Sequence, residues 1–388
     1  MKERSIPSPI HVYSDDIIYE ILTWLPAKSL IRFKGLSKFW NTTMSHDSFF
    51  IKLHRNHTGA RLGGENLLFH VQCGCEHKFI STDKDCINHI EEYTYFYPYD
   101  EEEARVSVAD GFVCFYRDMS STFSASLHNL STHESIALPE DSNFRKGYGI
   151  KSFFFIGFDS SHTLCKILHK TFPFNQDLGE SEFEVYTVGG AEQSWRILNS
   201  QAHDCRFCCT YGPSICINGV IYWFTCRWTG EDRSSREIII KAFDVSNERF
   251  HFISVPQGCP VHKLSNVNGV PSMMHWPGMD SELKLWKLEN YKNQIWVVES
   301  ILVDIVIPRL RDWMIPLLMG SIDSGKILVV QVMNDKKQSK ELFYYDLERN
   351  KSKFEEIIQP LQGRSNLADI SNCYTYVENI MPLKPISN

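Results

Sequence analysis

The segment Gly219-Val-Ile-Tyr-Trp223, followed by Ala242-Phe-Asp244 and then by Arg249-Phe-His-Phe-Ile253, indicates the fold of most of this chain. It reads as a strand that begins at a glycine, a long hairpin, a strand that ends in an aromatic-Asp pair, and a closing strand. The same order returns in two more units. They contain Gly325-Lys-Ile-Leu-Val-Val330, Tyr345-Asp346 and Phe354-Glu-Glu-Ile357 in one case, and Gly111, Leu127-His-Asn129 and Ile136-Ala-Leu-Pro139 in the other. Such a repeat is typical of the four-stranded blades of a β-propeller.

Similar β-rich segments fill the chain after Gly59, separated by Gly, Pro, Asn, Asp and Ser. They lie at residues 111–116, 152–156, 182–188, 214–224, 236–243, 294–298, 326–332 and 342–345. No long amphipathic helix separates them, which predicts an all-β domain rather than alternating strands and helices. Blades of roughly 45–50 residues would give about six or seven of them. A packed β-sandwich is the alternative architecture.

The first part of the chain has a helical period instead. Ser14 can cap a helix, and Asp15 and Asp16 would lie in its positive first turn. Its apolar stripe is formed by Ile17, Ile18, Ile21, Leu22 and Leu25. Pro26 ends this helix, and shorter apolar patterns predict a second helix over residues 30–36 and a third through residues 39–44. The pattern therefore predicts a small three-helix module, which would be marginally stable alone and would pack on something else.

The charge changes at the same place as the period. The whole chain has 388 residues, a net charge of −7, 43% hydrophobic residues and 13% aromatic residues. Residues 1–57 carry a net charge of +3, so the other residues carry −10. We therefore expect two domains, one over residues 1–57 with its core at about residues 13–54, and one over residues 58–388. An overall negative charge speaks against a nucleic-acid partner.

The helical segment resembles an F-box. The residues that carry the resemblance are Asp16-Ile-Ile-Tyr-Glu-Ile-Leu-Thr-Trp-Leu-Pro-Ala-Lys-Ser-Leu-Ile-Arg-Phe-Lys34 and Leu36-Ser-Lys-Phe-Trp40. Two positions depart from the usual F-box pattern. Tyr13-Ser14 stands where the first helix usually opens with Leu-Pro, and Phe39 stands where a smaller residue is commoner.

The β-rich part is similar to the F-box-associated domain of large plant families, including the S-locus F-box proteins. Ile217-Asn-Gly-Val-Ile-Tyr-Trp223 resembles the "NG-x-x-YW" strand of that domain, and Phe243-Asp-Val-Ser-Asn-Glu-Arg-Phe250 resembles its "FD-x-x-x-E-x-F" segment. Tyr374-Thr-Tyr-Val-Glu378 resembles its end. Gly189-Gly190 is typical of a kelch repeat but occurs once. The resemblance thus extends over most of the chain and implies a kelch-like propeller behind an F-box.

The resemblance implies a substrate adaptor of an SCF-type ubiquitin ligase. An F-box binds a Skp-type linker, which joins a cullin–RING ligase, while the C-terminal domain holds a target protein for ubiquitination. The residues expected to contact the linker are apolar and come from the helical module; they are Ile17, Ile21, Leu22, Leu25, Pro26, Leu30, Phe33 and Trp40. Lys28, Arg32 and Lys34 are expected at the rim of this surface. Some of these apolar side chains could instead form the core of the F-box itself.

Other functional readings find less support in the sequence. The chain lacks the phosphate-loop, HExxH, GxSxG and dinucleotide-binding patterns, so we expect no catalytic residues and no cofactor. Cys73-x-Cys75-x-His77 and His203-x-Cys205-x-x-Cys208-Cys209 lack the paired spacing of a structural zinc site, so we expect no metal. The acidic run Asp100–Glu103 reads as a solvated loop that could attract a basic target. A lectin-like or small-molecule-binding β protein with a degenerate F-box is the alternative function.

Two further expectations concern the cell and the target. The N-terminus has no apolar stretch typical of a signal peptide, and no segment is long enough for a membrane span. We therefore expect a reducing compartment, the cytoplasm or the nucleus, with the cysteines as free thiols. Target-binding residues stay unknown, but the connections Cys226 to Ser235 and Pro256 to Asp280 are candidates, since loops carry variable chemistry on a rigid scaffold.

Overall fold

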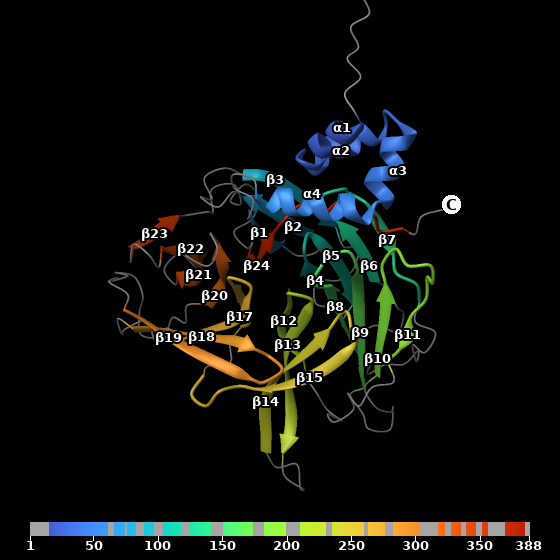
Figure 1. Ribbon diagram of the computed structural model, residues 1–388. Coiled ribbons are helices and arrows are strands. Elements are labelled where there is room, and N and C mark those ends of the chain that lie inside the picture. Colours follow the sequence, from blue (N-terminus) through green and yellow to red (C-terminus); the bar gives the residue numbers. More distant parts are fainter. Residues whose placement is uncertain are drawn as a thin grey trace, which may run out of the picture.

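The computed structural model of the chain combines a group of helices with a ring of antiparallel sheets (Figure 1). It describes residues 15–60, 66–73, 76–82, 89–96, 104–117, 125–140, 150–173, 182–198, 210–229, 235–259, 263–275, 282–302, 317–322, 327–334, 339–346, 351–355 and 369–384. Tyr13-Ser14, the acidic run at residues 100–103 and the cluster at residues 203–209 lie outside these ranges.

The helical module, by which we mean α1–α4, has one helix more than the sequence pattern predicted. Its helices are α1 (Asp15–Thr23), α2 (Ala27–Lys34), α3 (Lys38–His46) and α4 (Ser48–Ala60). The fourth helix escaped prediction because Asp47 reads as a break. The Asp47 carboxylate in fact begins α4, since its Oδ1 accepts hydrogen bonds from the amides of Phe49 (2.9 Å) and Phe50 (3.2 Å). The division of the chain into residues 1–57 and 58–388 stays a prediction.

The described strands form six four-stranded sheets, as expected for propeller blades and not for a sandwich. Four of the sheets contain consecutive strands up to residue 302. They are β4 (Ala104–Ala109), β5 (Phe112–Arg117), β6 (Ala125–Asn129) and β7 (Ser135–Ala137); β8 (Ile150–Phe158), β9 (Cys165–Pro173), β10 (Glu182–Thr187) and β11 (Arg196–Ile197); β12 (Thr210–Ile217), β13 (Val220–Thr229), β14 (Ser235–Asp244) and β15 (Arg249–Ser254); and β16 (Ser265–Val267), β17 (Val270–His275), β18 (Glu282–Asn290) and β19 (Ile295–Leu302).

The last two sheets close the ring. One contains β20 (Leu317–Ile322), β21 (Ile327–Asn334), β22 (Ser339–Asp346) and β23 (Lys351–Glu355), and the other contains β24 (Asp369–Tyr376), β1 (Asn66–Cys73), β2 (Glu76–Thr82) and β3 (His89–Phe96). In the latter, the final strand of the chain pairs antiparallel with the first, Asn66 opposite Tyr376. The ring is therefore held shut by hydrogen bonds between its two ends.

The blade repeat predicted from the sequence is confirmed, and its basis is a shared turn. Asn218-Gly219 joins the first two strands of one blade with positive φ at both residues (50° and 83°), and the pair Asp110-Gly111 does the same in another blade (50° and 77°). Turns of this kind match the twist of a hairpin and favour Asn or Asp before Gly. The segment 214–224, which the sequence suggested as one strand, is consequently a hairpin of β12 and β13.

The two connections proposed for target contact are shorter than expected. β13 continues to Thr229 and pairs with β14 from Ser235, so only residues 230–234 separate these two strands. The segment from Pro256 to Asp280 contains the hairpin of β16 and β17. Strong β-formers flanking short turns thus extend the strands into regions that the sequence pattern assigned to loops.

The helical module lies on one face of the ring (Figure 1). In a blade of four antiparallel strands, the turn between the first and second strands and the turn between the third and fourth strands share a face. Asp110, in the turn between β4 and β5, contacts Arg55 of α4. The helices therefore cover the face that carries the short turns. Among the described residues, no helix is long and apolar enough to cross a membrane.

Candidate functional site

The helical module is built around the packing of α1 on α4. The Tyr19 ring meets the Phe50 ring edge to face, with the ring centroids 5.1 Å apart. The Tyr19 hydroxyl donates to Oδ2 of Asp47 at 2.9 Å, and burial and the neighbouring carboxylate together raise the pKa of this phenol. The same Asp47 begins α4, so one carboxylate fixes both the start of a helix and the position of its neighbour.

A second contact between α1 and α4 holds Trp24 in place. The Trp24 ring stacks on the His57 ring, with the centroids 3.9 Å apart, and its Nε1 donates to Oε1 of Glu20 at 3.1 Å. The Thr23 hydroxyl donates to the Glu20 carbonyl at 2.7 Å, so its oxygen accepts from Nδ1 of His57 at 2.9 Å. Trp24 is thus fixed before any partner binds, although 46% of its surface is exposed.

The helical module exposes an unusual number of large apolar side chains. They come from all four helices and from the connections after α1 and α2, and they are Ile17, Ile21, Trp24, Phe33, Leu36, Phe39 and Phe49. The most exposed are Leu36 at 77% and Phe49 at 63%. Elsewhere in the described residues, only Ile197, Ile295 and Val298 are large, apolar and exposed. A concentration of this kind on a small module is typical of a surface that a partner covers.

The predicted linker-contact residues divide into three groups in the structure. Ile17, Ile21, Pro26 and Phe33 are exposed. Leu25 and Trp40 are partly buried and pack against the hydrophobic core.

Leu22 and Leu30 are 2% and 1% exposed, and both belong to that core. In an amphipathic helix, residues at the centre of the apolar stripe face the core, whereas residues at its edges stay accessible to solvent. Leu22 and Leu30 therefore support the module from within.

Four exposed apolar residues were absent from the sequence prediction. Leu36 and Phe39 belong to the apolar patterns that predicted the second and third helices, but neither was selected for the linker contact. Trp24 and Phe49 lie outside those patterns, so periodicity did not select them. For Trp24, Phe39 and Phe49 an available signal was their chemistry, since aromatic residues are enriched at interfaces. Phe39 contacts Trp40 edge to face, with the centroids 4.9 Å apart.

The basic residues expected at the rim have different environments. Lys28 and Arg32 are exposed, whereas Lys34 is partly buried. Burial lowers the pKa of the Lys34 ammonium, and the nearby Glu134 carboxylate of the propeller opposes that effect. Lys34 therefore faces the propeller, and Lys28 and Arg32 are available to solvent.

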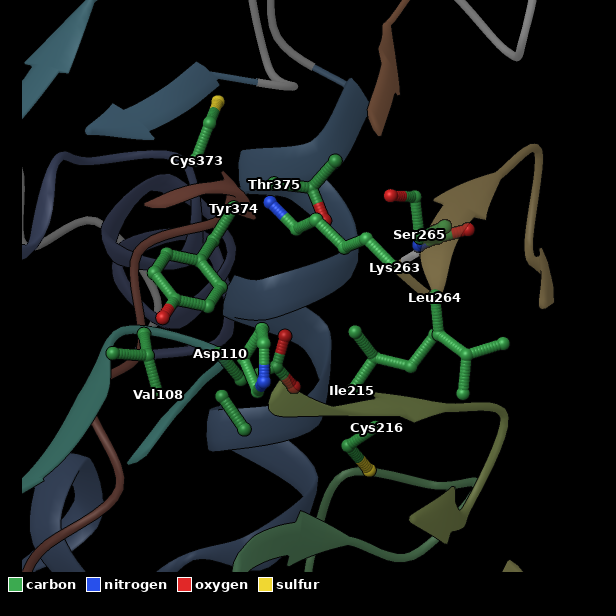
Figure 2. A pocket seen from close by; sticks show the side chains of 13 residues that line it. Val108, Asp110, Ile215, Cys216, Lys263, Leu264, Ser265, Cys373, Tyr374 and Thr375 are labelled. Atoms are coloured by element: carbon green, nitrogen blue, oxygen red, sulfur yellow. The ribbon is translucent and has the colours of Figure 1, made fainter. Parts of the chain in front are cut away.

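A small cavity lies among the first strands of the blades, which contact one another around the ring (Figure 2). Asp110, Cys216, Lys263 and Tyr374 contribute to its lining, and its volume of about 60 Å³ has room for a few water molecules. Burial raises the pKa of the Cys216 thiol to about 12 and also raises the pKa of the Tyr374 phenol. Both groups are neutral near pH 7, so this cavity offers neither a thiolate nor a phenolate for chemistry.

One buried constellation has the residue types of a hydrolase triad. Nε2 of His169 lies 3.3 Å from the Ser152 hydroxyl, and Nδ1 lies 3.4 Å from Oε2 of Glu184. The His169 ring is fully buried and stacks on Phe154 with the centroids 4.3 Å apart. The three residues are buried and lie on the neighbouring strands β8, β9 and β10, so they connect these strands.

Most of the metal-like patterns of the sequence lie outside the residues that the structure describes. Among the described residues, no group of three or more His, Cys, Asp or Glu residues could hold a metal ion. His77 is buried, and its Nδ1 lies 3.0 Å from Nε2 of His70. The side chains of Cys73 and Cys75 lie outside the described residues.

A helical module with an exposed apolar surface, set on a propeller, defines the class of this protein by its architecture. Comparison with known families is specific: the F-box domain matches residues 14–52, and the F-box associated beta propeller domain matches residues 66–380. Since the second match spans most of the chain, the protein belongs to the family of F-box proteins with an F-box associated β-propeller domain.

Its relatives include many plant proteins. F-box protein At2g16450 of Arabidopsis thaliana is 26% identical, over 98% of this chain and 96% of its own length. F-box protein At3g57590 of the same plant is 27% identical, over 73% of this chain and 70% of its own. F-box only protein 12 is 29% identical, over 72% of this chain and 60% of its own. The resemblance inferred from the sequence is thereby confirmed.

Proposed function

We propose that the protein is the substrate-recognition adaptor of an SCF-type ubiquitin ligase, with the helical module bound to a Skp-type linker and the propeller bound to a target protein. The observation that carries this proposal is the set of seven exposed apolar side chains on the module. A partner that buries them gains roughly 25 cal/mol for each Å² of apolar surface removed from water. Trp24 is held ready by Glu20 and His57, which reduces the entropy cost of binding.

The proposed role is to hold proteins together, without catalysis by this chain. F-box proteins are typically non-catalytic subunits of a ligase. The two constellations that could suggest chemistry support this role, since His169 is enclosed and Cys216 is held as a neutral thiol. The lectin-like alternative has no comparable observation behind it, since neither family match describes a carbohydrate-binding domain.

The proposed location is the cytoplasm or the nucleus. Six cysteines within the described ranges are free thiols, and they are Cys114, Cys165, Cys216, Cys226, Cys259 and Cys373. Free thiols suit a reducing compartment. Fractionation of tissue that produces the protein, with detection of the untagged chain, tests this location.

Copurification of the full-length protein with a Skp-type linker and a cullin tests the adaptor role. We expect a stable complex with the wild-type chain. Ile21→Glu combined with Phe33→Glu places two charges in the proposed interface, and we expect linker affinity to fall by tenfold or more, about 1.4 kcal/mol. Both residues are exposed, so the fold should persist. Calorimetric titration with purified linker measures the affinity.

The matched control is Ile295→Glu, a change of the same kind at a similarly exposed residue of β19, far from the helical module in sequence. We expect this variant to bind the linker as the wild type does. A wild-type chain that fails to bind the linker, or a control that loses binding equally, would contradict the proposed site.

A further inference from the structure

The last described segment of the chain, Val377–Lys384, extends beyond β24 across the face that carries the helical module; we call it the C-terminal strap. Its hydrogen bonds tie it to the turn after β6. Nδ2 of Asn129 donates to the carbonyls of Asn379 (2.9 Å) and Met381 (3.1 Å), and the Asn379 amide donates to the Ser131 hydroxyl at 2.9 Å. Asn129 and Asn379 are both buried. One edge of the strap is therefore part of the propeller.

The other edge of the strap holds α2. Oε2 of Glu378 accepts a hydrogen bond from the backbone amide of Ala27, the first residue of that helix, at 2.9 Å. Pro26, at the position before it, makes no side-chain bond to the helix. The first amides of a helix need an acceptor and favour a negative charge, and the Glu378 carboxylate provides both. A residue of the strap thus caps a helix of the F-box.

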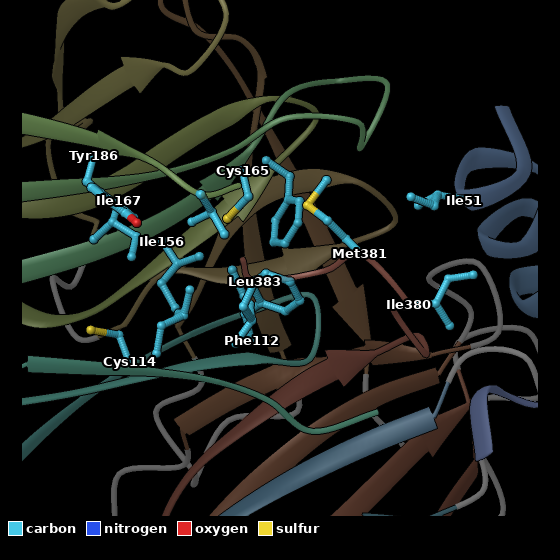
Figure 3. Close-up of a cluster of buried hydrophobic side chains, with 14 of the residues drawn as sticks. Ile51, Phe112, Cys114, Ile156, Cys165, Ile167, Tyr186, Ile380, Met381 and Leu383 are labelled. Carbon is cyan, nitrogen blue, oxygen red and sulfur yellow. The ribbon is translucent and has the colours of Figure 1, made fainter. Parts of the chain in front are cut away.

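Apolar packing joins the same parts. Ile380, Met381 and Leu383 of the strap are buried, and they lie in one hydrophobic cluster with Ile51 of α4 and Phe112 of β5. Figure 3 shows Met381 and Ile380 between the helix that carries Ile51 and the strands of the propeller. The cluster is continuous from the F-box to the blades, with the strap in the middle.

A charged contact provides a second attachment. Nη2 of Arg55, on α4, lies 2.7 Å from Oδ1 of Asp110, and Nδ1 of His162 lies 2.6 Å from Oδ2 of the same carboxylate. Asn379 of the strap donates to the backbone carbonyl of Asp110 at 3.4 Å. Burial alone would raise the pKa of Asp110, but Arg55 and His162 hold it below its usual value. Asp110 is therefore ionised and bound to Arg55 of the helical module at neutral pH.

From these contacts we infer that the C-terminal strap and the Arg55–Asp110 pair fix the F-box in one orientation on the propeller, with Glu378, Arg55 and Asp110 as positioning residues. The two attachments come from different elements, α2 and α4, so together they prevent rotation of the module about either one. The consequence is a constant direction from the linker-binding surface to the propeller. A role of this constant direction in ubiquitin transfer rests on the proposed adaptor function. The fixed orientation of the helical module does not depend on that function.

The test measures the distance between the two parts in the full-length protein. Pulsed electron resonance reports this distance between two spin labels carried by noncanonical residues. The labels replace Asn41 of α3 and Asn293 of the β18–β19 turn, which are both exposed. We expect one narrow distribution for the wild type. In Glu378→Ala combined with Arg55→Ala, that single distance should be lost and replaced by a broad distribution.

The conservative pair Glu378→Gln with Arg55→Lys keeps an acceptor and a cation at the same places, so it should restore the narrow distribution. Thermal unfolding shows whether either variant has lost its fold. Linker affinity, measured in parallel, should be the same in all three proteins, which separates this inference from the adaptor proposal. A narrow, unchanged distance in the alanine variant would overturn the inference. A broad distance distribution in the conservative variant would also overturn the inference, because the effect would then come from lost packing and not from the lost acceptor and cation.

A chain that ends at Tyr376 provides an independent variant, and a chain that ends at Lys384 is its control. The shorter chain keeps β24 and the closure of the ring but lacks the strap. We expect the distance distribution to broaden only in the shorter chain. An equally narrow distribution in a folded chain without the strap would overturn the role of the strap.

Discussion

At the scale of single residues, the blade turns show how strongly local geometry can constrain this sequence. Gly219 has φ of +83°, and a Cβ atom there would lie 2.8 Å from the backbone nitrogen of Ser160 in the neighbouring blade. Glycine is thus required both by the left-handed backbone and by a close approach between blades. The sequence pattern assigned residues 214–224 to one strand, and both the turn at Asn218-Gly219 and the contact with Ser160 are visible only in the structure.

Gly219→Ala should destabilise the protein by about 2–4 kcal/mol, because backbone strain adds to a clash with main-chain atoms that cannot move aside. Gly258→Ala is the matched control, since Gly258 has φ of +80° with nothing within 4 Å of an added Cβ. We expect this control to cost about 1 kcal/mol. Urea unfolding of both variants measures the difference. Equal losses in the two would show that the interblade contact does not matter.

At the scale of elements, the pairing of β1 with β2 encloses two histidines. His70 and His77 are buried and lie parallel, with their ring centroids 5.2 Å apart, and His70 also stacks on Phe79. Burial lowers the pKa of His70 to about 3, with a smaller effect from His77, and burial lowers the pKa of His77 to about 4. Both rings are therefore neutral in the folded protein near pH 7.

This pair should make the fold sensitive to acid. Above pH 6.5 the two histidines are neutral in both the folded and the unfolded protein. As the pH falls below 6.5, the unfolded chain binds protons that the folded chain excludes. The free energy of unfolding therefore falls until the pH reaches the folded-state pKa values. The loss at pH 5 is on the order of 2 kcal/mol for each histidine. Urea unfolding at pH 7.5 and pH 5 measures it. His70→Leu combined with His77→Leu should reduce this difference, and an unchanged difference would assign the acid sensitivity to other groups.

At the scale of the whole molecule, the chain depends on contacts between its two ends. β24 completes the sheet that begins with β1, and Tyr376 at its end is 3% exposed. The Tyr376 hydroxyl lies 3.0 Å from that of Ser131, and its ring lies against Gly111, in the blade next to the closing sheet. This residue therefore joins the closing sheet to its neighbour at the point where the strap begins.

Tyr376→Ala should reduce the free energy of unfolding by about 3–5 kcal/mol, as expected for removal of a buried aromatic ring. Tyr376→Phe keeps the ring and loses one hydrogen bond, which should cost about 1 kcal/mol. Equilibrium unfolding followed by tryptophan fluorescence gives both values. A small effect of the alanine variant would mean that ring closure does not depend on this contact.

The sequence by itself determined the features that depend on neighbouring residues. The stripe around Ile21 and the stop at Pro26 specify a helix and its end, and the order of strands that begins at Gly219 repeats along the chain, because helix period and strand pattern are local properties. These features predicted a small helical module and a propeller, and the resemblance of the module to an F-box and of the β-rich part to an F-box-associated domain is confirmed by the comparisons. The number of helices was wrong because a single Asp47 can either end one helix or begin the next.

Only the tertiary structure decided which side chains reach the surface and which distant segments meet. Ile21 is 54% exposed while Leu22, its neighbour in the same stripe, is 2% exposed, since the difference depends on where α4 packs. Ala27 and Glu378 are 351 positions apart, and no pattern along the chain relates them. The closing of a ring brings such residues together. The attachment of the F-box to its propeller is therefore a property of the folded chain, with no local signature in the sequence.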